Sequence, residues 1–81
     1  MAKFLITLPP MPKDKVKSTW ESVNQASVGS DLLMERAFID ESNNQAICCW
    51  SAPDRKSIED LFLKAKIVPA LIREVVEYSR S

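Results

Sequence analysis

The feature that most constrains this chain is the order in which its hydrophobic period changes along 81 residues. Three segments are rich in β-forming residues and predict strands, at residues 3–8, 32–40 and 45–51. Residues 13–27 repeat apolar side chains every three or four positions, as does the segment after Asp54, which predicts two helices. We interpret residues 70–79 as a last strand, with a helix as the alternative. The order strand, helix, strand, strand, helix, strand is that of a ferredoxin-like fold.

Proline, glycine and aspartate residues mark where these elements begin and end. Pro9 and Pro10 stop the first strand, because proline lacks the amide hydrogen that a sheet ladder needs. Gly29 follows the first helix as a stop residue, and Asp54 is placed to cap the second helix with its carboxylate. Pro69 blocks continuation of that helix. These boundaries predict an α+β domain, with a four-stranded antiparallel sheet and both helices on one face.

The chain is long enough for one domain, which we assign to residues 1–81. A chain of this length buries roughly 60% of its surface on folding, which is marginal for a lone domain. Cys48 and Cys49 are adjacent, so they form no disulfide framework of the kind that stabilises small secreted proteins. We therefore expect oligomerisation to supply further stability, in a cytoplasmic protein with reduced thiols.

Residue counts exclude several classes of function. Without His, the chain has no His-based catalytic triad and no His-ligated metal site, and with one Gly it has neither a P-loop nor a dinucleotide-binding fingerprint. Eleven basic and eleven acidic side chains give a formal net charge of zero, which argues against nucleic acid and anionic membranes as partners. No apolar run approaches the length of a membrane span. We expect no cofactor.

We place the function on the side of the predicted sheet that faces away from the helices. Strand alternation puts Arg36 and Phe38 on one face. If the turn between the two hairpin strands centres on Asn43, Phe38 pairs with Cys48. The same register pairs Arg36 with Trp50, so the four side chains share the open face, and a shift of one residue would reverse this assignment. Aromatic side chains on an open face indicate an interface, and we predict a homodimer through it.

A more specific hypothesis for these residues is that the dimer encloses a small anionic or aromatic ligand. The planar guanidinium of Arg36 can hold a carboxylate through two hydrogen bonds, and an ion pair with Glu74 or Glu77 is the alternative role. Cys48 carries a nucleophilic atom, but no base is visible near it in the sequence, so we expect a structural thiol. Whether the protein is an enzyme is left open.

The predicted hairpin carries the run Arg36-Ala37-Phe38-Ile39, a polar turn, and the run Ile47-Cys48-Cys49-Trp50-Ser51-Ala52-Pro53. This arrangement resembles a family of small bacterial domains of unknown function. The family pattern has an Arg or His before Ser-Tyr, then a turn, then an aromatic-Cys-x-Tyr-x-Ala-Pro strand end. The chain is identical to it at Cys48, Ala52 and Pro53. Arg36 stands at the Arg or His position, and Phe38 and Trp50 replace the two tyrosines.

The resemblance implies a ferredoxin-like subunit and a dimeric α+β barrel. Some family members are described as nickel-binding through histidines, which this chain lacks, so we expect no metal site. RNA binding, which uses stacked aromatics on a basic sheet, is also a lesser alternative. The main prediction is a small homodimeric module that binds a small ligand or another molecule. The alternative is an isomerase-like or monooxygenase-like enzyme of the dimeric barrel type, with Arg36 holding the anion.

Overall fold

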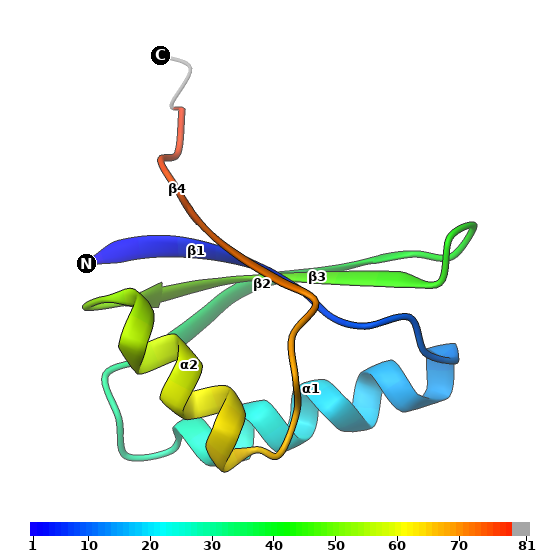
Figure 1. The fold of residues 1–81 in the computed structure, drawn as a ribbon, viewed down its shortest axis with the longest axis horizontal. Helices are drawn as coiled ribbons and strands as arrows, with labels where there is room; N and C mark the ends of the chain where they lie inside the picture. Colours follow the sequence, from blue (N-terminus) through cyan, green and yellow to red (C-terminus); the bar gives the residue numbers. More distant parts are fainter. Residues whose placement is uncertain (79–81) are drawn as a thin grey trace.

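The computed structural model describes residues 1–78 and contains the six elements in the predicted order (Figure 1). Their bounds are β1 (Ala2–Thr7), α1 (Lys13–Ser27), β2 (Leu33–Asp40), β3 (Gln45–Ala52), α2 (Arg55–Lys64) and β4 (Leu71–Val75). The strands form one sheet in the order β2-β3-β1-β4, and every neighbouring pair is antiparallel. The ferredoxin-like fold class predicted from the sequence is therefore confirmed.

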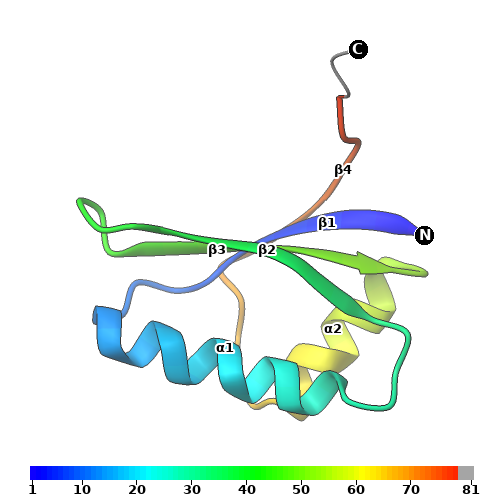
Figure 2. The same cartoon turned by 180° about the vertical axis from the view of Figure 1, so that it is seen from behind.

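Both helices cover the same face of the sheet, as the views from the front and from behind agree (Figures 1 and 2). We call the opposite side of the sheet the open face. After β4, residues 76–78 leave the sheet on the side of this open face (Figures 1 and 2). The layers therefore run from helices to sheet to open face, and no other segment of residues 1–78 covers the open face.

The core lies between the sheet and the helices, and the two central strands supply the largest share of it. Strand alternation turns every second residue of β1 and β3 toward the helices, because successive side chains of a strand point to opposite faces. The fully or almost fully buried side chains from these strands are Phe4, Ile6, Ala46, Cys48, Trp50 and Ala52. The helices meet them with Val16, Val23, Ile58, Leu61 and Phe62.

The helix ends follow the local chemistry that the sequence indicated. Asp54 caps α2, since one of its carboxylate oxygens accepts a hydrogen bond of 2.8 Å from the backbone N–H of Ser57. Gly29 has a φ of 86° just beyond α1, a left-handed conformation that residues with a Cβ rarely adopt. Pro12 precedes α1 directly, in an extended conformation, so the proline-rich segment ends where the helix begins.

The last strand is shorter than predicted. The sequence indicated residues 70–79, whereas β4 covers Leu71–Val75, and Ser79 lies outside the described residues. The sheet explains the early end, because β4 pairs only with β1 and Val75 already lies opposite Lys3 near the start of that strand. A strand that runs past its partner loses the hydrogen bonds that hold it in the sheet.

Candidate functional site

The structure separates the four residues that the sequence assigned to one ligand site. Arg36 and Phe38 lie on the open face, as predicted, and Phe38 is 57% exposed. Cys48 and Trp50 lie on the other side of the sheet, buried under the helices. Their predicted placement on the open face is wrong, and only Arg36 and Phe38 of this set can meet a partner there.

The cause is the register of the hairpin. Asp40 pairs with Gln45 across a four-residue turn, so Phe38 lies opposite Ile47 and not opposite Cys48. A slip of one residue moves every side chain of a strand to the other face. The observed register buries Ala46, Cys48, Trp50 and Ala52 in the core, and it leaves Gln45, Ser51 and the half-buried Ile47 on the open face.

A bulge in β2 adds a second departure from simple alternation. The register shifts between Met34, which lies opposite Trp50, and Arg36, which lies opposite Cys49. A bulge places two residues opposite one, so Glu35 joins Arg36 on the open face, although alternation predicted it on the opposite side. The hydrogen bond from Ser51 Oγ to Glu35 Oε1, 2.7 Å long, shows where that carboxylate lies.

One row of side chains crosses the whole open face. Cys49 lies opposite Arg36 on one side and Leu5 on the other, and Leu5 in turn lies opposite Arg73. We call the four residues Arg36, Cys49, Leu5 and Arg73 the central row. It begins and ends with a guanidinium at the two edge strands, and the two residues between them are uncharged. Within residues 1–78, neither arginine forms an ion pair or a side-chain hydrogen bond.

The next row along the strands is mainly apolar. Phe38 lies opposite Ile47, which lies opposite Thr7, and Thr7 lies opposite Leu71. We call these four residues the apolar row. Phe38 and Leu71 are exposed at its two ends, while Ile47 and Thr7 are half-buried. The open face therefore presents large apolar side chains next to two unpaired guanidiniums.

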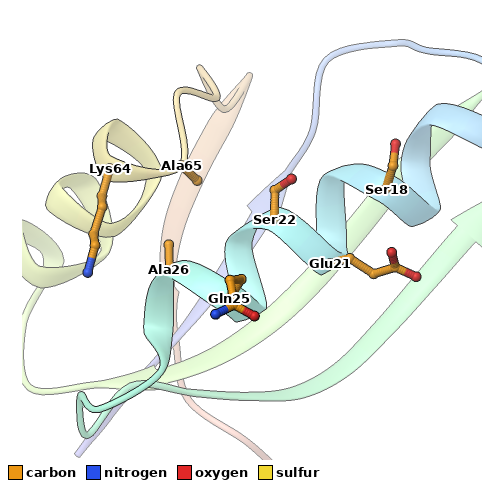
Figure 3. A pocket seen from close by; sticks show the side chains of 7 residues that line it. All are labelled: Ser18, Glu21, Ser22, Gln25, Ala26, Lys64 and Ala65. Carbon is orange, nitrogen blue, oxygen red and sulfur yellow. The ribbon is translucent and has the colours of Figure 1, made fainter.

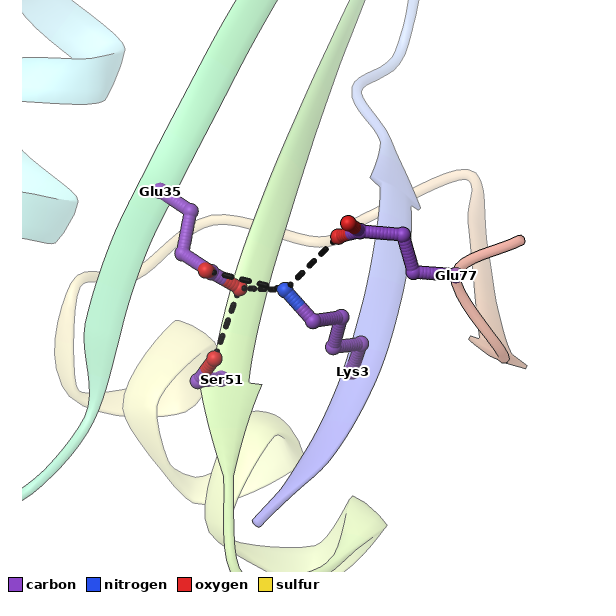
Figure 4. A network of polar contacts seen from close by, with 4 residues as sticks. All are labelled: Lys3, Glu35, Ser51 and Glu77. Carbon is purple, nitrogen blue, oxygen red and sulfur yellow. Dashed lines mark hydrogen bonds and ion pairs between the residues drawn. The ribbon is translucent and has the colours of Figure 1, made fainter. Parts of the chain in front are cut away.

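The other end of the open face is polar and internally paired (Figure 4). Lys3 Nζ lies 2.9 Å from both carboxylate oxygens of Glu35 and 3.1 Å from Glu77 Oε1. Ser51 Oγ donates to the same Glu35 carboxylate. These contacts raise the pKa of Lys3, chiefly through Glu35, and lower the pKa of Glu35, chiefly through Lys3. The carboxylates of this end thus form their ion pairs with Lys3, and the charge of Arg36 makes only a smaller contribution to the lowered pKa of Glu35.

The two thiols have different surroundings. Cys48 Sγ lies 3.7 Å from the carbonyl oxygen of Ile6 in the core, and burial raises the pKa of this thiol to about 11. A thiol with this pKa stays protonated at neutral pH, which supports the expectation that Cys48 is structural. Cys49 lies half-buried on the open face, in the central row, and burial also raises its pKa.

Hollows on the surface of the single chain lie away from the predicted ligand residues. A depression of about 620 Å³ lies between the two helices, lined by Ser18, Glu21, Ser22, Gln25, Ala26, Lys64 and Ala65 (Figure 3). Another, of about 750 Å³, lies beside Trp20 and Ile39. Neither includes Arg36, Phe38, Cys48 or Trp50 in its wall. The predicted residues share no hollow, because the sheet itself lies between the two pairs.

Among residues 1–78, no group of three or more His, Cys, Asp or Glu side chains is placed to hold a metal ion. In the same part of the chain, neither helix has both the length and the apolar character to cross a bilayer.

Comparison with solved structures finds the same fold in SCO4226 from Streptomyces coelicolor A3(2), known from a crystal structure analysis. The two chains superpose with a TM-score of 0.80, and the match covers 96% of this chain and 100% of that one. Their sequences are 15% identical, so the likeness shows a shared small α+β fold and nothing about ligands. No family model matches the chain, and no curated protein matches it. Membership in the family that the hairpin resembles stays a prediction.

Proposed function

We propose that this protein is a homodimeric binding module whose subunits associate through their open faces and take up a small amphipathic anion between them. The observation that carries the proposal is the composition of the open face. It combines an apolar row, with Phe38 and Leu71 exposed, and a central row with an unpaired arginine at each end.

The apolar part of this surface supports association. An aromatic side chain that stays in water forgoes about 1.5–3 kcal/mol of burial free energy, and Phe38 is the largest exposed side chain of the sheet. A chain of 81 residues has a small core, so covering a second face of its sheet adds stability that the single subunit lacks. Two such sheets packed face to face would form an α+β barrel.

The ligand assignment follows from the charged part. Arginine holds carboxylate, sulfonate or phosphate groups through parallel hydrogen bonds. Arg36 suits this role because it lies on the open face and forms no ion pair within residues 1–78. Phe38 lies two residues along the same strand, where it can contact the apolar body of the ligand. Cys48 and Trp50 support the site from beneath the sheet.

The dimer is tested by Phe38→Glu, with Leu63→Glu as the matched control. Leu63 is 74% exposed on α2, in the helix layer, so the same change of side chain there leaves the open face intact. By sedimentation velocity at micromolar concentration, we expect dimers for the wild type and for L63E and monomers for F38E. A wild type that sediments as a monomer both in the absence and in the presence of an amphipathic anion would contradict the proposal.

The ligand is tested by native mass spectrometry of protein purified from its host, which reports the oligomer and any retained molecule together. We expect a bound anion that is lost from Arg36→Gln and retained by Lys56→Gln, an equal loss of charge on the exposed surface of α2. Retention of the same molecule by R36Q would remove Arg36 from the site.

A further inference from the structure

The central row of the open face carries like charges that would oppose self-association through this face. Arg36 and Arg73 stand at its two ends, on the edge strands β2 and β4, three strand spacings or about 14 Å apart. Within residues 1–78 neither is paired, while Glu35 and Glu77 of the same face are both bound to Lys3. The row therefore carries two positive charges and no negative one.

Two-fold symmetry brings these charges together. In a face-to-face homodimer the symmetry axis lies between the two sheets, and the central row is the middle one of three. If the axis runs along the strands through the middle of the face, Arg36 lies over the partner's Arg73. If it runs across the strands there, Arg36 lies over its own copy. In both arrangements two pairs of guanidiniums face each other, one pair at each edge of the interface, and Leu5 and Cys49 lie between the pairs.

Such an interface is unfavourable unless something neutralises it. Like charges that face each other across a contact cost several kcal/mol, and desolvating an unpaired charge adds to that cost. An oxyanion removes both costs, because it accepts hydrogen bonds from more than one guanidinium at once. The neighbouring apolar row, with Phe38 and Leu71 exposed, would contact an apolar body attached to that anion.

From this geometry, and resting on the proposed dimer, we infer that dimerisation is linked to anion binding. The bound molecule is a small amphipathic anion, with a carboxylate, sulfonate or phosphate group between the arginines of the two subunits and an apolar body on the apolar row. The ligand then acts as part of the interface, and each subunit contributes Arg36 and Arg73. Arg73 is the residue that this inference adds to the site.

The experiment measures the dimer dissociation constant by sedimentation at constant ionic strength, with one of two probes. Anilinonaphthalene sulfonate is an amphipathic anion, and N-phenylnaphthylamine has the same aromatic body without the sulfonate. We expect the sulfonate to tighten the wild-type dimer by about tenfold or more at saturation, since a ligand bound only by the dimer shifts the equilibrium toward it. The neutral compound should change the dimer dissociation constant by no more than about twofold, because it neutralises no charge.

The double variant Arg36→Gln and Arg73→Gln provides the second arm. Both side chains are exposed, so the variant should unfold in urea at nearly the wild-type midpoint. Without ligand it should dimerise at least as tightly as the wild type, and the sulfonate should no longer tighten it. Each single variant, R36Q or R73Q, should be tightened by the sulfonate less than the wild type.

The outcomes separate this inference from the proposed function. A wild-type dimer that is equally tight with and without the sulfonate would overturn the anion linkage and leave the dimer standing, with carboxylates of the partner neutralising the arginines. Equal tightening by the neutral compound would also overturn it, because the apolar row alone would then account for the effect. A protein that stays monomeric with every probe would overturn the proposed dimer itself.

Discussion

Phe38 on β2 lies directly opposite Ile47 on β3, on the side of the sheet away from both helices. This one pairing sets the face of every residue in the second half of the hairpin. It places Ala37 opposite Cys48 against the core, and it sends the largest aromatic side chain of β3, Trp50, under the helices. The open face is left with Phe38 as its one exposed aromatic side chain among the described strand residues.

The register predicts that truncating Trp50 lowers the free energy of unfolding much more than truncating Phe38. Trp50→Ala removes a fully buried side chain and should lower the free energy of unfolding by about 3–5 kcal/mol. Phe38→Ala removes an exposed one and should change it by less than about 1 kcal/mol when association does not contribute. Urea unfolding at submicromolar concentration, followed by the fluorescence of the remaining tryptophans, measures both. Equal costs would mean that the hairpin is paired in the other register.

The two adjacent thiols should differ in reactivity. Cys48 is buried with a pKa raised to about 11, whereas Cys49 is partly accessible on the open face. At pH 8, and at a protein concentration low enough for the open face to be uncovered, we expect iodoacetamide to modify Cys49 at least about tenfold faster than Cys48, because the thiolate is the reactive form and must be reached. Mass spectrometry of Cys48→Ser and Cys49→Ser resolves the two rates. Faster labelling of the C49S variant would contradict the placement of Cys48.

The cap at the start of α2 should give the stability of the protein a pH dependence. The backbone N–H of Ser57 lowers the pKa of Asp54 in the folded chain. A carboxyl group with a lowered folded pKa stabilises above its unfolded pKa, and that stabilisation is lost as the pH falls through the folded value. Asp54→Ala should therefore lower the urea midpoint at pH 7, and the gap to the wild type should close between about pH 5 and pH 2. A gap that stays constant over this range would exclude the charged cap.

The polar end of the open face offers a direct measurement of pKa. Lys3 is the main cause of the lowered pKa of Glu35, and Lys13 has the same relation to Glu41. Lys3→Gln should raise the pKa of Glu35 and leave that of Glu41 unchanged, and Lys13→Gln should do the reverse. A carboxyl-carbon NMR titration reads both groups in one experiment. No change at Glu35 in K3Q would show that the contact is absent in solution.

Local sequence signals predicted the elements well because those signals act within a few residues. The helical spacing of residues 13–27 matches α1, Lys13–Ser27, and the capping carboxylate of Asp54 marks the start of α2. The end of β4 was missed, because a strand continues only while its neighbour can pair with it. The residues after Val75 are suitable for a strand. Beyond Lys3, however, only Ala2 and Met1 remain on the β1 side to pair with them.

The sequence placed two of the four candidate site residues on the correct face of the sheet. Arg36 and Phe38 were placed on the open face by simple alternation, which needs only their own strand. Cys48 and Trp50 were misplaced, because their face depends on how β3 pairs with β2 and on which side the helices pack. Alternation along the last strand allows either Arg73 or Ile72 on the open face, and the pairing of Arg73 with Leu5, together with the burial of Ile72, decides for Arg73.

The sequence by itself therefore determined the order of the elements, their caps and the charges available, since each depends on neighbours along the chain. Only the tertiary structure decided which residues share a face. Pairing across strands has a period of two, so a shift of one residue, or one bulge, exchanges core and surface without changing any local preference. The two arginines belong together for the same reason: 37 positions apart in sequence, they end one row of the sheet because β3 and β1 lie between their strands.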